Sequence, residues 1–459
     1  MPETPQHVNP STDLSGGLNR RRLFKMGGAI AAGSIATPLI SSCSSASASE
    51  PLRFWNFYSP VTQEKEDLQR QSDWFAKLVS DWNSSHERQV VLEYIPGQAY
   101  SGSKLPTAFA AGNGPDIFLI SPGDFLRYQT GGVLADLTPY MTQEAIDDFF
   151  PDALATRTVD GKVYALPMEI EPLTIFYSRP AWERAGLSEG DIPTSWDQLL
   201  NVADKLTSAS SSGLVLETVP GYYQNFTYYP WFWAANGKMF NEDQTAATFA
   251  GAAGEQSLRF WADTVRTGVA PRTLPAAGDL VGALSGGQAA MWHSGIWNVV
   301  AFQLNAPDFD YGVFKTPWPS GGEYTTALGG WAFVANAKSR DAQAAAEFCV
   351  YALGSMEDHS INRMVDWCTY AKSDIAPRKS ALQRGTAKGG YDTPVMKTFK
   401  DDIFPGGRGE PRYPPVVYKA ISDAVQACQL AGADPAQAAE TANKAIDAYL
   451  KTYDGPRME

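Results

Sequence analysis

Aromatic rings and acidic side chains are the groups in this sequence that could do chemistry. The chain of 459 residues has 22 Phe, 20 Tyr and 13 Trp, but only four His and four Cys. Flat rings can pack on the apolar surfaces of a ligand, while carboxylates accept hydrogen bonds from its hydroxyl groups. The scarcity of imidazoles and thiols leaves little for a protein-bound metal. The composition therefore favours ligand binding, and neither a metal nor another cofactor is expected.

The charge balance and the absence of certain motifs argue against several classes of function. The formal net charge is −13 and the sequence pI is about 4.9, which makes the phosphate backbone of nucleic acid a poor partner. The sequence contains no G-x-x-x-x-G-K-[ST] motif for ATP and no G-x-S-x-G motif of a serine esterase. We therefore expect neither a nucleic-acid-binding protein nor an ATP-binding protein or serine esterase.

Strands and helices alternate along the first part of the chain, and they must position any such site. Strand patterns cover residues 52–58, 90–95 and 115–120, with helical patterns at 64–83 and 104–111 between them. This order predicts a parallel α/β sheet with helices on its faces. Ligands of open α/β sheets bind outside the carboxyl ends of the strands, so the loops there are the first place to look.

The N-terminus has the pattern of an export signal. Three arginines at 20–22 precede an apolar stretch at 26–40 and the small residues before Cys43, which resembles a twin-arginine signal with a lipidation site. We predict a signal over 1–42, a lipid on Cys43 and a tether over 43–51. A plain signal peptide with a chance cysteine is the alternative. The sequence leaves open whether any two of Cys349, Cys368 and Cys428 pair.

Seven short motifs in one order carry a resemblance that covers nearly the whole chain after the signal. The chain is similar to the extracellular solute-binding proteins of ABC sugar importers, family 1, the class that contains maltodextrin-binding protein. The motifs are Gly114-Pro115-Asp116-Ile117, Gly132-Val133-Leu134-Ala135-Asp136-Leu137, Asp160-Gly161-Lys162-Val163-Tyr164-Ala165-Leu166-Pro167, Thr174-Ile175-Phe176-Tyr177, Pro193-Thr194-Ser195-Trp196-Asp197, Gly287-Gln288-Ala289-Ala290-Met291 and Gly329-Gly330-Trp331.

The resemblance implies a two-lobed α/β fold of the periplasmic-binding-protein type II, with a hinge and a ligand cleft between the lobes. Lobe 1 is expected to comprise 52–168 and 332–378, and lobe 2 to comprise 172–328 and 382–455. No residue is expected to be catalytic.

The resemblance also implies ligand contacts at the ends of the first and third strands. They are Trp55, Asn56 and Tyr58 at the first strand and Asp124 in the loop after the third. Trp55 could instead belong to the core, because strand residues alternate between faces, and Asp124 could cap the next helix.

Further contacts are implied in the second lobe and at the crossings. Glu171 aligns with a ligand-binding Glu of the family, although Glu169 could take its role. Rings expected to stack on a sugar are Tyr228, Tyr229, Trp231, Trp297 and Trp331. Arg408 could bind hydroxyls, a carboxylate or a phosphate, or it could lie in a surface loop.

The expected function is that of an exported lipoprotein anchored to the outer face of the cell membrane through Cys43. It would capture a sugar or oligosaccharide and deliver it to the permease subunits of an ABC transporter. Two alternatives stay open: the same fold could bind a glycerophosphodiester or another polar solute, or the chain could be a secreted glycoside hydrolase with a pair of carboxylates.

Overall fold

The computed structural model describes residues 50–60 and 66–459. The predicted export signal (1–42), the predicted lipidation site Cys43 and most of the predicted tether lie outside these residues. None of the helices in the described ranges is both long and apolar enough to cross a bilayer. The three cysteines in these ranges, Cys349, Cys368 and Cys428, are all buried and unpaired.

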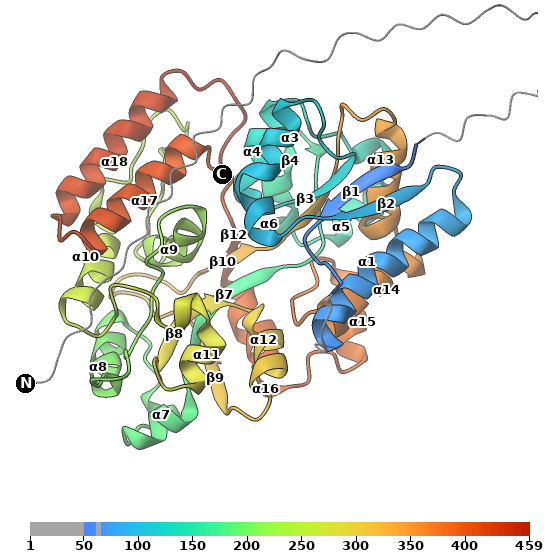
Figure 1. The fold of residues 1–459 in the computed structure, drawn as a ribbon. Coiled ribbons are helices and arrows are strands. Elements are labelled where there is room, and N and C mark those ends of the chain that lie inside the picture. The colour runs from blue at the N-terminus through green and yellow to red at the C-terminus, as the bar shows by residue number, and fades with distance from the viewer. Residues whose placement is uncertain (1–49, 61–65) are drawn as a thin grey trace, which may run out of the picture. The chain divides into compact units, whose positions relative to one another are not determined.

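A first sheet combines the early part of the chain with one strand from much later (Figure 1). Its order is β2-β1-β3-β11-β6, in which β1 runs parallel to β2 and β3, while β11 runs antiparallel to β3 and β6. All four residues of β3 are buried, as expected for a strand covered on both faces. The strands are β1 (Leu52–Asn56), β2 (Val90–Tyr94), β3 (Ile117–Ile120), β6 (Leu166–Pro167) and β11 (Ala332–Ala335).

A second sheet is built around β7, whose eight residues are all buried. Its order is β12-β10-β7-β8, and β9 also pairs with β7. A separate hairpin of β4 and β5 turns at Asp160 and Gly161, both at positive φ. The strands are β4 (Thr158–Val159), β5 (Lys162–Val163), β7 (Glu171–Ser178), β8 (Met291–Gly295), β9 (Tyr311–Phe314), β10 (Thr326–Gly329) and β12 (Gly407–Gly409).

Helices pack on both sheets, so the chain has the α/β fold with two lobes that the sequence predicts. α1 and α13 contact strands of the first sheet, whereas α9 contacts β10 of the second and is covered in turn by α10 and α17 (Figure 1). The first half of the chain contains α1 (Glu66–Ser85), α2 (Gly97–Ala99), α3 (Leu105–Ala110), α4 (Pro122–Thr130), α5 (Gln143–Asp148), α6 (Pro151–Leu154), α7 (Arg179–Arg184), α8 (Trp196–Leu206) and α9 (Tyr222–Ala234). The second half contains α10 (Ala252–Arg266), α11 (Leu280–Ser285), α12 (Asn298–Asn305), α13 (Ala342–Cys349), α14 (Asp358–Asp366), α15 (Lys379–Ala387), α16 (Pro394–Lys397), α17 (Pro415–Gln429) and α18 (Pro435–Leu450).

Three segments meet where the two sheets adjoin. Residues 168–170 lead from β6 of the first sheet to β7 of the second, and residues 330–331 lead back from β10 to β11. Residues 372–378 lie beside the first of these, because Ile170 and Ile375 form an antiparallel bridge. We call these three the crossing segments. The division of the remaining chain at the predicted lobe boundaries stays a prediction.

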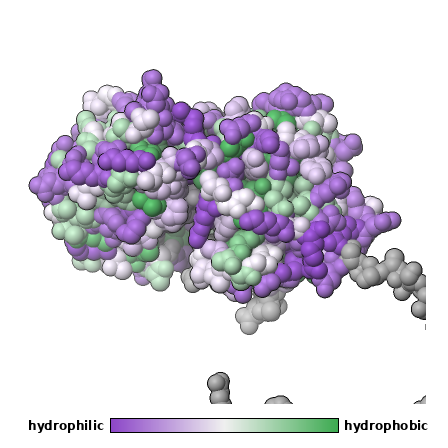
Figure 2. All heavy atoms as spheres, turned by 90° about the horizontal axis from the view of Figure 1, so that it is seen from above, coloured by the Kyte–Doolittle hydropathy of each residue, from purple (hydrophilic) through white to green (hydrophobic). Residues whose placement is uncertain are grey.

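The outer surface is polar over most of the face seen in Figure 2. Hydrophilic side chains dominate there, and the hydrophobic ones form small separate patches. Most of the Phe, Tyr and Trp side chains in the described residues are buried or partly buried, and α9 shows this most clearly. All residues of this helix from Gln224 to Ala234 are buried, as expected for a helix that packs on all sides.

Candidate ligand-binding site

A cavity of about 270 Å³ lies beside the crossing segments. In α/β folds ligands bind outside the carboxyl ends of the strands, and most residues of this cavity wall come directly after such an end. Ser121 follows β3, Trp297 follows β8, Gly330 and Trp331 follow β10, and Glu410 follows β12. The complete lining is Ser121, Glu171, Tyr222, Tyr223, Phe226, Trp297, Gly330, Trp331 and Glu410.

Five aromatic rings form the apolar part of this wall. The Phe226 and Trp297 rings lie 6.3 Å apart at 31°, and the Tyr223 and Trp297 rings lie 6.1 Å apart at 62°. On the other side, Trp331 packs edge-on against Phe57, with ring centroids 4.7 Å apart. Glycine is required beside these rings: a Cβ at Gly330 (φ +116°) would lie 2.5 Å from the carbonyl oxygen of Glu169. The rings offer flat apolar surfaces to a ligand.

Two buried carboxyl groups form the acidic part of the wall. Oε1 of Glu171 accepts a hydrogen bond from Nζ of Lys372 at 2.7 Å, and Oε1 of Glu410 accepts one from the hydroxyl of Tyr222. Burial raises the pKa of Glu171 to about 7, although the attraction of Lys372 opposes the shift. Burial also raises the pKa of Glu410 well above its ordinary range. Both groups are strong acceptors when ionised.

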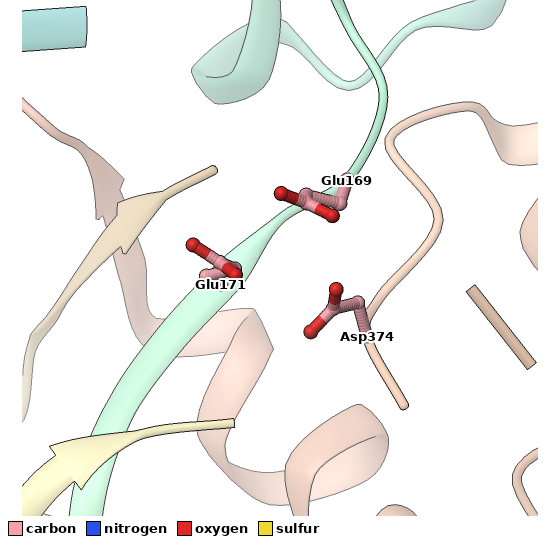
Figure 3. Close-up of side chains that lie close together, drawn as sticks. All are labelled: Glu169, Glu171 and Asp374. Carbon is pink, nitrogen blue, oxygen red and sulfur yellow. The ribbon is translucent and has the colours of Figure 1, made fainter. Parts of the chain in front are cut away.

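Lys372 lies at the centre of an ionic cluster that joins two crossing segments. Its Nζ is 2.9 Å from Glu169, 2.7 Å from Glu171 and 3.0 Å from Asp374. Figure 3 shows the two glutamates at the start of β7 and Asp374 facing them from a neighbouring loop. Oxygens of these three carboxylates lie within 4.8 Å of one another, a spacing that could hold a metal ion. The ammonium group of Lys372 already serves as the cation of this cluster.

A contact between α4 and α9 lies beside the cavity. The backbone N–H of Gly123 in α4 donates to the hydroxyl of Tyr222 in α9 at 3.2 Å. The approach is possible because residue 123 has no side chain: a Cβ there would lie 1.7 Å from the Tyr222 ring. Tyr222 therefore links the first turn of α4 to Glu410, which follows β12.

The structure brings three of the residues predicted from sequence together in the cavity wall. Glu171, Trp297 and Trp331 come from β7, the turn before α12 and a crossing segment, respectively. Their roles in binding stay a prediction. The cavity is also lined by five residues that were not among the residues predicted from sequence: Ser121, Tyr222, Tyr223, Phe226 and Glu410.

The three rings of α9 that were expected to stack on a sugar are core residues, so that expectation needs correction. Tyr228, Tyr229 and Trp231 are at most 1% exposed. The Tyr228 hydroxyl lies 2.6 Å from Oγ of Ser257, and the Trp231 ring stacks on Phe260 at 4.8 Å. These rings fill the space between α9 and its neighbouring helices. The cavity is lined instead by rings from the first turns of the same helix.

The predicted contacts at the end of β1 do not line the cavity. Nε1 of Trp55 donates to Glu93, and Trp55 is buried, as in its alternative role in the core. Asn56 is buried and accepts a hydrogen bond from the backbone N–H of Tyr58. The Tyr58 ring stacks on Phe75 at 5.3 Å. Trp55 and Asn56 are therefore part of the first sheet, and Tyr58 lies beside Lys372 of a crossing segment, whose Nζ is 5.9 Å from the ring centroid.

Asp124 and Arg408 also lie apart from the other candidates. Asp124 is in the first turn of α4 and pairs with Arg127 at 3.6 Å. The Arg408 guanidinium lies over the Trp233 ring at 4.9 Å and lines a second cavity, of about 200 Å³, together with Glu459. Neither side chain lines the cavity that contains Trp297 and Trp331.

Comparisons with known proteins agree with this architecture. The model of the family described as "Bacterial extracellular solute-binding protein" matches residues 66–357. The arabinooligosaccharide-binding protein of Bacillus subtilis is 25% identical over 336 residues, which are 67% of this chain and 70% of that protein. The multiple sugar-binding protein of Streptococcus mutans is 21% identical over 300 residues, 60% of this chain and 66% of its own.

Solved structures share the fold over most of the chain. An ABC transporter solute-binding protein from Thermotoga lettingae, bound with α-D-tagatose, has a TM-score of 0.72 at 22% identity and covers 88% of this chain and 100% of its own. UgpB from Mycobacterium tuberculosis, in complex with glycerophosphocholine, has a TM-score of 0.72 at 20% identity. The match covers 88% of this chain and 99% of UgpB. With the family match over residues 66–357, these findings show that the chain belongs to the family of bacterial extracellular solute-binding proteins.

Proposed function

We propose that this protein captures a sugar or short oligosaccharide in the cavity beside the crossing segments and delivers it to the permease of an ABC importer. The observation that carries the proposal is the cavity wall itself, in which five rings and two buried carboxylates converge from the first turns of α9 and from the ends of separate strands. Rings match the C–H faces of a sugar, and carboxylates match its hydroxyl groups. The relatives named for arabinooligosaccharides and multiple sugars support the same ligand class.

Binding would be coupled to closure of the two lobes. Ser121 reaches the cavity from the first sheet, whereas Trp297 and Glu410 reach it from the second. A ligand that touches both sides makes its full set of contacts only when the lobes are together, so it shifts the population toward that state. The closed form is then the one that a permease would recognise.

The same proposal includes an anchor outside the cell. The family is extracellular, which supports export. A lipid on Cys43 would hold the protein at the outer face of the membrane close to its permease. Mass spectrometry of the membrane fraction tests this point: a Cys43→Ala variant should lose the lipid and appear in the soluble fraction.

Two other ligand or activity classes have less support. The nine residues that line the cavity include no Lys or Arg, which disfavours the phosphate of a glycerophosphodiester. The relatives named above are binding proteins, and they give no support to a glycoside hydrolase.

A thermal-shift titration of residues 50–459 tests the proposal. The panel should contain arabino-, malto- and galacto-oligosaccharides, monosaccharides and glycerophosphocholine, with product formation followed in parallel. Saturable stabilisation by a sugar without new products is the expected result. Turnover of an oligosaccharide, or stabilisation by glycerophosphocholine alone, would contradict the proposal.

A further inference from the structure

Glu410 is a buried carboxyl group of the cavity wall without a cation in contact. Its residue is 2% exposed, and Oε1 accepts from the hydroxyl of Tyr222. In residues 50–60 and 66–459, no Lys, Arg or His forms an ion pair with it. Arg157 is the basic group whose charge acts on it most, yet this guanidinium donates to the backbone carbonyls of Ala153 and Gly330. The carboxyl group therefore has a hydroxyl donor but no counter-charge in contact.

Lys372 cannot supply the counter-charge that Glu410 lacks. Its single ammonium group is shared by the carboxylates of Glu169, Glu171 and Asp374. With Glu410, four buried carboxyl groups share two basic groups, Lys372 and Arg157. A buried carboxylate without a paired cation is costly, so the surplus must be met by protons or by a cation from outside.

The cavity is where an outside cation could reach this surplus. Glu171 and Glu410 both line it, and their hydrogen bonds to Lys372 and Tyr222 use only Oε1. In the described part of the chain, no N–H or O–H group donates to Oε2 of either residue. The five rings of the same wall present negative faces that attract ammonium groups. A neutral hydroxyl group could donate to these oxygens, but it would leave the charge surplus unchanged.

We propose that the cavity selects a positively charged ligand, an amino sugar or amino-sugar oligosaccharide, whose ammonium group pairs with Glu410 and is enclosed by the aromatic wall. This inference rests on the proposed sugar-binding function and narrows its ligand class. Three N–H donors of one ammonium group suit several acceptors, and the pair would be desolvated by the rings. The raised pKa values of Glu171 and Glu410 agree with carboxyl groups that lack a counter-charge when the cavity is empty.

Calorimetric titration with glucosamine oligomers and their N-acetylated counterparts tests the inference. The two series differ in charge but share the same sugar rings, and at about pH 6.5 the free amines are mostly protonated. The glucosamine series should bind at least tenfold more tightly. Raising the salt concentration should weaken binding of the glucosamine series and leave the neutral series nearly unchanged.

A pair of matched variants tests whether Glu410 causes the preference for the charged series. Glu410→Gln should remove most of the preference for the charged series, whereas Glu459→Gln, which changes a carboxyl group of the second cavity, should keep it. Equal or tighter binding of the neutral series would overturn the inference but leave the proposed function intact, as would a salt-independent preference. Failure of every sugar, charged or neutral, would overturn both.

Discussion

Nζ of Lys372 lies 2.7 Å from Oε1 of Glu171, so one ion pair joins a crossing segment to the wall of the cavity. The same ammonium group holds Glu169, which in turn accepts hydrogen bonds from the backbone N–H of Trp331 and from Nε1 of Trp367. The binding wall and the junction of the two sheets are therefore one buried network. Its members should be sensitive to substitution in stability as well as in affinity.

Replacing Lys372 should destabilise the protein strongly. Lys372→Met leaves three buried carboxylates without their cation, and we expect a loss of about 3–5 kcal/mol in the free energy of unfolding. Urea unfolding at pH 8 measures it. The loss should be smaller at pH 5, because the raised pKa values of Glu171 and Asp374 mean that these two groups are then protonated and no longer repel as charges. Lys419→Met, which removes an exposed pair with Asp423, is the control and should cost less than about 1 kcal/mol.

The stability of the protein should fall as the pH rises through the range where Glu171 loses its proton. The folded pKa of about 7 lies above the ordinary value of 4.5, so between these values the folded state binds more protons than the unfolded state. Stability contributed by this group is full below about pH 4.5 and is lost as the pH approaches 7, by roughly 3 kcal/mol.

Comparison with Glu171→Gln isolates this contribution. The free energy of unfolding of the wild type, minus that of the variant, should decrease from pH 4.5 to pH 7 in urea titrations. A difference that stays constant or increases would mean that Glu171 is ionised throughout.

Trp297 and Trp331 should contribute to affinity. Either substitution by Ala removes a ring from the cavity wall, and we expect a loss of roughly 1–2 kcal/mol in binding free energy, a rise of about 5- to 30-fold in Kd. Calorimetry with a sugar found by the thermal-shift screen measures it. Trp318→Ala alters a partly exposed ring that lines a different cavity, and it should leave Kd unchanged.

Two aromatic residues of α9 should give opposite results. Trp231→Ala creates a void in the core and should cost about 3–5 kcal/mol of stability, while the remaining folded protein keeps its affinity. Tyr223→Ala removes a ring that is 40% exposed and should cost less than about 1 kcal/mol of stability but weaken binding. If Trp231→Ala lowers affinity without unfolding the protein, our assignment of the two faces of this helix is wrong.

The fold could be predicted from sequence because its signals are local or shared with a family. Strands expected at 52–58, 90–95 and 115–120 occur as β1, β2 and β3 with slightly later starts or earlier ends. The positions of Trp297 and Trp331 beside the cavity follow from a simple rule, since each residue comes just after a strand of the second sheet.

The rest of the cavity wall depends on contacts that a single sequence does not display. Successive helix residues are turned by about 100°, so the facing rings of α9 depend on where the helix starts. Residues 222, 223 and 226 line the cavity, and by this rotation Tyr228 and Trp231 point away from Phe226. Tyr229 has nearly the direction of Tyr222 but lies two turns further along the helix, where it packs on Trp233 and Tyr413. Glu410 reaches the wall because Gly409 pairs with Leu328 across some eighty residues of chain, and nothing local in the sequence indicates this pairing.

The close approach of the Tyr222 ring to Gly123 has a consequence for how the protein could be studied. In Gly123→Ala the added methyl group would clash with the Tyr222 ring, between the first turns of α4 and α9. Such a variant would keep every group of the binding wall and yet hold the two halves apart. If ligand binding closes the lobes as proposed, this variant would separate recognition of the ligand from closure.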